Sequence, residues 1–240
     1  TKRNKRVKCN TCVLEDETPS LPFHDVLGRW IKKQRYIGYS TKELRRAMDG
    51  FNDHRQHDAQ EVLLNILDNL TESSPSMKHI IAKHLDFQLK TIVRGDPSVS
   101  NYYSKTVSPG RFLSLPIAST LKKSYNQFNE IESIDDYYDD KNCITCTAKK
   151  QMFVSKWSDY LLVHIKEYDN YLRKVRIDNR ITPLVWNIEN SIDGRVFKTT
   201  YLALSAIVHI GGLNGGHYIT VHHIPDNAIY HSHDDMDESG

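Results

Sequence analysis

The sequence predicts an α+β fold, with helices in the first third of the chain and antiparallel strands in the rest. Before about residue 80, apolar residues recur at the three- and four-residue spacing of amphipathic helices. After that point, several runs alternate between apolar and polar residues with the period of two that is typical of strands. Helices followed by a series of strands form the α+β pattern, and a chain of 240 residues can bury the core that it requires.

Three helices are expected in the first part of the chain. The apolar residues of 23–36 follow a helical spacing, and they are Phe23, Val26, Leu27, Trp30 and Ile31. Residues 40–43, Ser-Thr-Lys-Glu, have the capping-box pattern that opens a second helix. A third helix should begin near Asp58. Its apolar stripe consists of Val62, Leu63, Ile66, Leu67 and Leu70.

Strands account for most of the remaining chain. The runs that predict them are 87–93, 112–117, 152–154, 160–165, 184–188 and 201–208. Residues 121–140 differ, because Ile131, Ile134 and Tyr137 recur at helical spacing among many acids. We expect one helix or two short ones there, with 135–140 as a solvated acidic face. A hairpin closes the chain, with arms at 218–224 and 228–233 that turn at 225–227.

The composition excludes some classes of partner. The net charge is +2, 26% of the residues are charged, and no long basic run is interleaved with aromatic residues. The sequence therefore predicts neither nucleic-acid binding nor attachment to a membrane surface. No apolar run is long enough to span a membrane, and no signal-peptide pattern is present. We expect a soluble, intracellular protein.

Chemically distinctive residues gather at 208–218, the glycine hairpin, which reads Val-His-Ile-Gly-Gly-Leu-Asn-Gly-Gly-His-Tyr. Four of the 11 glycines of the chain lie in it. The residues before it, 202–208, are expected to form a buried strand. Because glycine permits positive φ and close approach of another backbone, Gly215 and Gly216 predict a narrow slot beside His217.

His217 is the candidate general base of that slot, since an imidazole ionises near neutral pH. The terminal hairpin should return the chain so that Asp234 comes beside His217, where a carboxylate would orient the ring. Two other interpretations stay open from the residues alone. The hairpin ends can be unrelated surface residues, or they can bind a metal ion. The candidate metal ligands are His222, His223, His231, His233, Asp234 and Asp235.

Three blocks of the sequence carry a resemblance to a known family. The pattern His209-x-Gly211-(x)4-Gly216-His217-Tyr218, followed by a hairpin and an Asp-Asp pair, resembles the histidine box of the ubiquitin-specific proteases. Residues 56–63, Gln-His-Asp-Ala-Gln-Glu-Val-Leu, are similar to the Gln-Gln-Asp-Ala-His-Glu-Phe-Leu helix start of that family. Residues 159–166 resemble its strand that ends in Leu-Lys-Arg-Phe.

The resemblance implies a papain-like cysteine peptidase fold in a single catalytic domain over 1–240. A helical thumb would occupy about 20–80, and an antiparallel-sheet palm with shortened fingers would occupy 81–240. The implied activity is hydrolysis of the bond after the C-terminal Gly-Gly of ubiquitin, by a Cys/His/Asp triad and without a cofactor. His217 and Asp234 would belong to the triad, Asp235 would support it, and ubiquitin or a ubiquitinated protein would be the partner.

The resemblance also implies a site for the ubiquitin tail. Its residues would be Gln56, Asp58, Glu61, Gly215, Gly216 and Tyr218. From the residues alone, Asp58 and Glu61 have a simpler interpretation, because carboxylates in the first turn of a helix suit its dipole. In the family, the acids of this block hold the basic, extended tail of ubiquitin.

The nucleophile is the open element of this prediction. The family places it in a block Asn-x-Gly-Asn-Thr-Cys, of which residues 10–12, Asn-Thr-Cys, match three. Acids at 15–17 would raise the pKa of the Cys12 thiol, and Pro19 would interrupt a following helix. We therefore expect the nucleophile in a cysteine upstream of these residues. The alternatives are Cys12 itself and an inactive ubiquitin-binding or scaffold module without a nucleophile.

The four cysteines form two Cys-x-x-Cys pairs, Cys9/Cys12 and Cys143/Cys146. The second pair stands where the fingers of the family carry their second Cys pair. The first pair of the fingers is replaced by residues 94–97, Arg-Gly-Asp-Pro. The two pairs could together bind one zinc ion, but 130 residues separate them and the sequence does not show that they meet. Because the first pair of the fingers is missing, we expect no conventional zinc site in the fingers.

Overall fold

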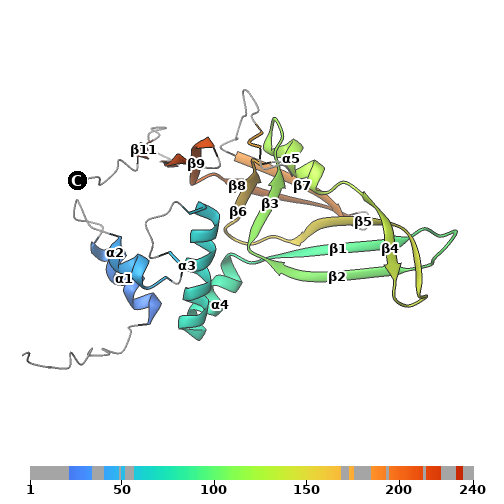
Figure 1. Cartoon of the computed structure of the whole chain (residues 1–240), viewed down its shortest axis with the longest axis horizontal. Helices are drawn as coiled ribbons and strands as arrows, with labels where there is room; N and C mark the ends of the chain where they lie inside the picture. The colour runs from blue at the N-terminus through green and yellow to red at the C-terminus, as the bar shows by residue number, and fades with distance from the viewer. Residues whose placement is uncertain are drawn as a thin grey trace, which may run out of the picture.

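The computed structural model describes residues 22–33, 41–48, 50–51, 57–168, 173–175, 185–192, 195–212, 215–222 and 231–234. Helices α1 to α4 lie together at one end of the molecule, and a long antiparallel sheet extends from the other (Figure 1). Helix α5 (Leu121–Phe128) and two two-stranded sheets lie between these two ends. The α+β class that the sequence predicts is confirmed.

The helical end consists of α1 (Phe23–Lys33), α2 (Lys42–Arg46), α3 (Ala59–Ser73) and α4 (Pro75–His84). The apolar sides of these helices meet in one cluster. Its buried members are Phe23, Leu44, Met48, Leu67, Leu70 and Ile81. The three helices that the sequence predicts are therefore present, and their stripes form a common core.

One detail of the helical end differs from the prediction, and another lies outside the described residues. Ser40, the first residue of the predicted capping box, is not among those residues, and the side chain of Thr41, the N-cap of α2, makes no capping hydrogen bond. Helix α4 is not among the three helices that the sequence predicts. Pro75 is the first residue of α4, where the fixed φ of proline favours a helix start.

The long sheet, called here the finger sheet, has the order β2-β1-β5-β4 and is antiparallel throughout. Its strands are β1 (Phe87–Gly95), β2 (Tyr103–Gly110), β4 (Glu132–Asp139) and β5 (Ile144–Lys156). Helix α5 (Leu121–Phe128) precedes β4 and confirms one short helix in 121–140. The rest of that segment is strand, so the expectation of a second helix is wrong.

A β-bulge produces the helix-like spacing of Ile134 and Tyr137. Ile134 lies opposite Ala148 and Tyr137 lies opposite Cys146, so a step of three residues on β4 matches a step of two on β5. Asp136, inside the bulge, has a φ of 57°. The bulge therefore turns the strand period of two into an apparent helical step.

Asp139 contradicts the expected solvated acidic face over 135–140, because its side chain is 0% exposed. Its carboxylate accepts hydrogen bonds from Ser100 Oγ at 2.5 Å, from Asn142 Nδ2 at 2.7 Å and from the Lys141 backbone N–H at 3.0 Å. The bond from Ser100 is the main cause of a lowered pKa for Asp139. Asp139 thus connects the β4–β5 turn to the turn between β1 and β2. In the Cys pair that follows Asp139 in the chain, Cys143 is exposed and Cys146 is buried.

The middle of the molecule contains two two-stranded sheets. One pairs β3 (Phe112–Pro116) with β6 (Leu162–Lys166), and the other pairs β7 (Val185–Ile192) with β8 (Arg195–Leu202). The β3–β6 pair is parallel, which corrects the prediction of an antiparallel sheet for 112–117. A parallel pair needs a long crossover, and α5, β4 and β5 supply it. The core here is formed by Phe87, Leu113, Leu115, Tyr125, Val154, Trp186 and Ile188.

A three-stranded antiparallel sheet of order β11-β10-β9 carries the glycine hairpin. Its strands are β9 (Ser205–Gly212), β10 (Gly215–His222) and β11 (His231–Asp234). The predicted strand over 201–208 is divided between β8 and β9. The expected burial of this run is wrong for the start of β9, where Ile207 and Val208 are 55% and 40% exposed. The sheet has β9 at its edge, so only one side of this strand is paired.

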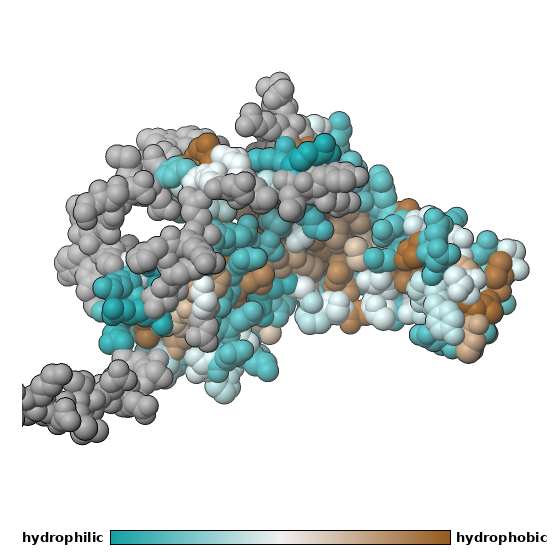
Figure 2. Space-filling model, viewed as in Figure 1, coloured by the Kyte–Doolittle hydropathy of each residue, from teal (hydrophilic) through white to brown (hydrophobic). Residues whose placement is uncertain are grey.

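On the face shown in Figure 2, hydrophobic residues gather in the middle of the molecule and at the tip of the finger sheet. Hydrophilic residues cover much of the helices and the strands around them. No helix in the described ranges is both long enough and apolar enough to cross a bilayer.

Candidate active site

The N-terminus of α3 is one side of the candidate site. Asp58 is its N-cap, and one carboxylate oxygen accepts from the backbone N–H groups of Gln60 at 2.8 Å and Glu61 at 3.1 Å. Both acids are exposed at the surface. The structure therefore confirms that Asp58 caps the helix. Both capping bonds go to the same carboxylate oxygen of Asp58, and the other oxygen takes part in neither of them. Gln56 lies outside the described residues.

The glycine hairpin forms the other side. Gly211 lies opposite Gly216, and Gly212 lies opposite Gly215 in the β9–β10 ladder. Gly211 has a φ of +126°, and a Cβ on it would lie 2.6 Å from the Gly216 Cα. Only glycine tolerates this geometry without strain.

The space beside Gly216 is filled by the chain itself. A Cβ on Gly216 would lie 2.1 Å from Nε2 of His209 and 2.7 Å from the Ile210 carbonyl oxygen. The open slot that the sequence predicts at this glycine is therefore wrong for Gly216, because the His209 ring occupies the space. The same ring packs against Tyr218, with the two ring centres 4.8 Å apart.

The predicted site residues lie on two faces of the C-terminal sheet. Side chains alternate between the faces of a strand, so Gly216 and Tyr218 share one face and His217 occupies the other. Tyr218 lies directly opposite His209, which places both on the first face.

The antiparallel pairing of β10 with β11 confirms that the two arms of the predicted terminal hairpin meet, and its predicted turn at 225–227 lies outside the described residues. Asp234 lies opposite Ile219, two positions beyond His217 on the same strand. Opposite positions in a ladder share a face, so position 234 is diagonal to His217. The side chains of His231, His233 and Asp234 and all of His223 and Asp235 lie outside the description. The triad and the alternative metal site thus stay predictions.

Tyr218 joins the hairpin to α3. Its hydroxyl accepts from the backbone N–H of Ala59, the first residue of that helix. Partial burial and then the negative charge of Asp58 raise the pKa of Tyr218. Two of the residues predicted to bind the ubiquitin tail, Asp58 and Tyr218, are therefore neighbours, although 160 positions separate them in the chain.

His164 on β6 is a member of this site that the sequence analysis does not single out. Burial lowers the pKa of His164, and the charges of Asp58 and Glu167 only partly oppose that shift. Its Nδ1 is buried and has no hydrogen-bond partner among the described residues. The imidazole is therefore neutral near pH 7. A single polar residue within the apolar run 161–165 is the signal that could have identified it.

A second unpredicted group lies along the outer edge of β9. Lys174 Nζ lies 3.6 Å from a carboxylate oxygen of Glu167, and it donates to the carbonyl oxygen of His209 at 2.8 Å. Residues 167–168 and 174–175 also pair as a short antiparallel ladder, through the bridge Tyr168–Lys174 and the bond from Val175 N–H to the Glu167 carbonyl at 2.7 Å. Glu167 therefore lies directly after the end of β6, where its carbonyl oxygen and its carboxylate both contact the segment 174–175.

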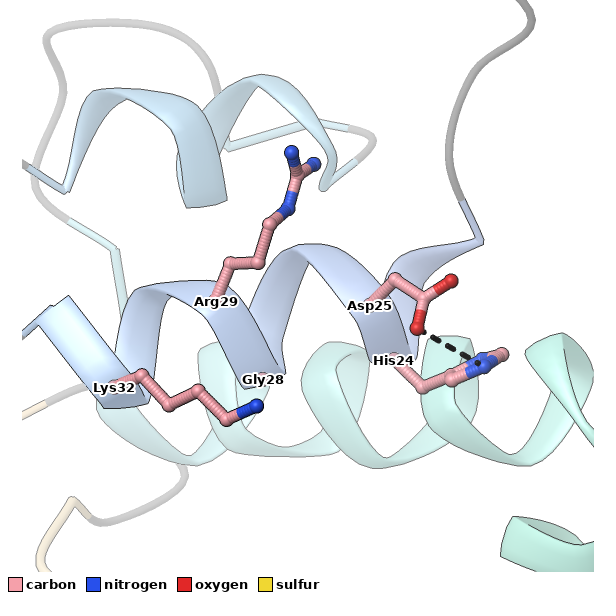
Figure 3. Close-up of a pocket in the computed structure, with 5 residues that line it drawn as sticks. All are labelled: His24, Asp25, Gly28, Arg29 and Lys32. Atoms are coloured by element: carbon pink, nitrogen blue, oxygen red, sulfur yellow. Dashed lines mark ion pairs between the residues drawn. The ribbon is translucent and has the colours of Figure 1, made fainter.

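Hollows elsewhere on the surface contain none of these residues. One lies along α1 and is lined by His24, Asp25, Gly28, Arg29 and Lys32 (Figure 3). Within it, His24 and Asp25 form an ion pair at 3.6 Å. No group of three or more His, Cys, Asp or Glu side chains in the described part of the chain is arranged to hold a metal ion.

Solved structures share this fold. The Ubp8/Sgf11/Sus1/Sgf73 DUB module of SAGA bound to ubiquitin aldehyde contains a chain that matches 92% of this one with a TM-score of 0.70, at 20% identity and over 57% of its own length. A second structure of a Ubp8 module, bound to monoubiquitin, matches 80% of this chain and 49% of its own, with a TM-score of 0.65 and 22% identity. These likenesses establish the fold.

Curated relatives come from Arabidopsis thaliana. Ubiquitin carboxyl-terminal hydrolase 23 is 26% identical over 203 residues, which are 74% of this chain and 23% of the relative. Ubiquitin carboxyl-terminal hydrolase 4 is 27% identical over 105 residues, which are 41% of this chain and 28% of the relative. The chain thus spans about a quarter of the length of either protein.

The family model described as ubiquitin carboxyl-terminal hydrolase matches residues 4–238, nearly the whole chain. Its range includes α3 with its capped N-terminus, the glycine hairpin and the paired terminal strands. By this match, the chain belongs to the ubiquitin carboxyl-terminal hydrolase family.

Proposed function

We propose that this chain is the catalytic part of a thiol-dependent deubiquitinase that cleaves the peptide or isopeptide bond after the C-terminal Gly-Gly of ubiquitin. The observation that carries the proposal is the contact between the Tyr218 hydroxyl and the Ala59 N–H. This contact joins the capped start of α3 to the hairpin that bears His217. Family membership and relatives with the hydrolase name support the same activity.

In the proposed mechanism, His217 takes the proton of the cysteine thiol and later gives a proton to the leaving amine. Asp234 orients the ring of His217, and Asp235 supports the pair. The thiolate attacks the carbonyl carbon of the last ubiquitin glycine, the amine leaves, and water then releases ubiquitin from the thioester. No cofactor takes part in these steps.

The ubiquitin tail would lie between α3 and the glycine hairpin. Asp58 and Glu61 carry the negative charge for its basic residues, and Gln56 belongs to the same block. Tyr218, Gly215 and Gly216 provide the other wall, in which the His209 ring occupies the side-chain space of Gly216. A tail that ends in two glycines suits a passage bounded by a ring and a backbone.

The nucleophile of the proposed enzyme lies outside the described residues. The cysteines that the structure describes are Cys143 and Cys146, beside the β4–β5 turn of the finger sheet. That turn lies at the far end of the molecule from the C-terminal sheet (Figure 1). We therefore expect a cysteine upstream of these residues, or else Cys12, to supply the thiolate of an active enzyme.

The test is the intact mass of the protein after incubation with ubiquitin that carries a C-terminal thiol-reactive electrophile. The 240-residue chain and a form extended upstream are compared. An adduct on the extended form alone places the nucleophile upstream, and an adduct on both, mapped to Cys12, identifies that residue. Binding of ubiquitin without any adduct would instead show the inactive module.

The role of His217 has its own test. Replacing it by alanine should abolish turnover and leave the affinity for ubiquitin nearly unchanged, because the ring acts on the reacting atoms and not on the body of ubiquitin. Turnover rate and ubiquitin affinity are measured on the same samples. A parallel loss of affinity would assign His217 a structural role.

A further inference from the structure

Lys174 lies in a position that a surface lysine rarely occupies. Its side chain is 19% exposed, and its ammonium group contacts three atoms of β9. These are the carbonyl oxygen of His209 at 2.8 Å, the carbonyl oxygen of Gly211 at 3.3 Å and Nδ1 of the His209 ring at 3.4 Å. Glu167, at 3.6 Å, balances its charge. The lysine therefore spans the outer edge of β9 where the glycine hairpin begins.

The geometry shows which edge of β9 is held. Carbonyl groups two residues apart point to the same side of a strand. The Ile210 carbonyl oxygen lies near Gly216 of β10, so the carbonyls of His209 and Gly211 point away from that strand. Within the described residues, Lys174 binds these two outward carbonyls as a paired neighbour strand would.

The same contact decides the tautomer of His209. An ammonium group has only hydrogens to donate, so the Nδ1 that faces Lys174 must accept. A neutral imidazole with an accepting Nδ1 carries its proton on Nε2. That nitrogen is the atom that occupies the side-chain space of Gly216, one residue before His217.

We propose that Lys174 is a positioning residue that fixes His209 as the Nε2–H tautomer beside Gly216, so that the ring N–H can donate to a backbone carbonyl of an extended peptide in the glycine hairpin. The peptide part rests on the proposed function. The contact of Lys174 with Nδ1 and the tilted packing of the ring against Tyr218 leave the ring little freedom to turn. A donor of fixed position binds a carbonyl at a smaller loss of entropy than a mobile one.

The direct test is the ring ¹⁵N spectrum of the histidines near pH 7.5, with His209 assigned from a His209→Gln variant. The wild-type protein should show His209 protonated at Nε2 alone. Lys174→Met should give a mixture of the two neutral tautomers, and Lys174→Arg, which keeps a donor, should restore the wild-type signals. An Nδ1–H form in the wild type, or an unchanged His209 in Lys174→Met, overturns the proposal.

A matched control is available on β8. Lys198 also forms an ion pair, with Glu189 at 2.7 Å, but its side chain is 73% exposed. Lys198→Met removes the same charge from an exposed ion pair that does not include His209, and it should leave the His209 signals unchanged. Glu167→Gln should leave the tautomer of His209 unchanged, because the bonds from Lys174 to the two carbonyl oxygens of β9 do not depend on Glu167.

The substrate part is tested by kinetics on the form that reacts with the ubiquitin electrophile. Lys174→Met should lower kcat/KM by about three- to tenfold, the equivalent of one weakened hydrogen bond, mainly through KM. Lys174→Arg should have a kcat/KM close to that of the wild type, and Lys198→Met should leave kcat/KM unchanged. An unchanged kcat/KM in Lys174→Met refutes the donor role of His209.

Failure of the proposed function gives a different result. A wild-type protein that neither hydrolyses nor binds ubiquitin, but whose His209 tautomer depends on Lys174, refutes the proposed function and the peptide part together. It leaves the positioning of His209 established. If the enzyme is active but the tautomer of His209 is the same with and without Lys174, the inference is refuted and the proposed function stands.

Discussion

A single buried side chain can stabilise a turn of this protein when it accepts several hydrogen bonds. The carboxylate of Asp139 collects four, from Ser100, Lys141 and two groups of Asn142, and it is fully buried by the two finger turns. A buried carboxylate is stable only when its charge is compensated in this way. Asp139 therefore holds the tip of the finger sheet together.

Asp139→Asn should reduce the free energy of unfolding at pH 7. The bonds lower the pKa of Asp139 below 3.8, so its contribution is present above the pKa of the unfolded chain and is lost as pH falls through the folded value. The difference between variant and wild type should therefore shrink below about pH 4. Urea unfolding at pH 7 and pH 3 measures it. Asp135→Asn, exposed on the same strand, is the control, and an equal difference at both pH values contradicts the prediction.

Tyr218→Phe should reduce the free energy of unfolding by about 1 kcal/mol, because the N–H of Ala59 loses its acceptor while the ring keeps its packing on His209. Urea unfolding of the two proteins measures the change. Tyr138→Phe, on a tyrosine that is 53% exposed, should have almost no effect. If the two variants behave alike, the bond between Tyr218 and α3 does not contribute to stability.

At the scale of an element, the glycine hairpin combines two kinds of constraint. At Gly211 the obstacle to a side chain is backbone, namely the Gly216 Cα and the Gly215 carbonyl, together with a positive φ. At Gly216 the nearest obstacle is the His209 ring. At Gly212 nothing lies within 4 Å of an added Cβ. The three positions should therefore respond differently to alanine.

Gly216→Ala should destabilise the protein by about 1–3 kcal/mol through overpacking. A second change, His209→Ala, should relieve part of this loss, since the Ile210 carbonyl oxygen remains close. Gly211→Ala should be as harmful and should gain nothing from His209→Ala, whereas Gly212→Ala should be tolerated. Unfolding free energies of the single and double variants form a double-mutant cycle. Additive effects of Gly216→Ala and His209→Ala would contradict the contact.

For the whole molecule, the important contacts are those between the helical end and the strands. Arg111, in the turn between β2 and β3, binds Asp68 of α3 at 3.0 Å and Asp86, just before β1, at 2.9 Å. His84 at the end of α4 binds the Asp159 carboxylate at 2.6 Å and accepts the Tyr160 N–H on its carbonyl oxygen at 2.9 Å. Phe112 and Leu162 add apolar contacts to the helical core. These contacts set how the start of α3 meets the glycine hairpin.

Arg111→Ala should reduce the free energy of unfolding by about 1.5–3 kcal/mol, because Asp86 is only 15% exposed and would lose its partner. Arg111→Lys should retain part of the stability, since one ammonium group cannot reproduce the fork of a guanidinium. Urea unfolding followed by circular dichroism and by tryptophan fluorescence measures the change. Lys198→Ala, which breaks an exposed ion pair, is the control, and an equal response of both variants contradicts the role of Arg111.

The sequence by itself determined the features that depend on neighbouring residues. The stripes of α1 and α3, the cap at Asp58 and the strand at β1 all follow from spacing or capping, which a few adjacent residues decide. The pairing of β10 with β11 also followed, because a hairpin is a local structure. The three-residue spacing of Ile134 and Tyr137 fits either a helix or a bulged strand, and the helix predicted from it was wrong.

Only the tertiary structure decided the contacts between distant parts of the chain. It paired β3 with β6 in parallel, buried Asp139 under Ser100, and brought Lys174 to His209 and Tyr218 to the start of α3. Each of these joins residues at least 35 positions apart, and no spacing within the sequence encodes the path between them. The environment of the candidate site therefore depends on how the packed cores orient the elements, since burial and neighbouring charge, which set its chemistry, exist only after the chain has folded.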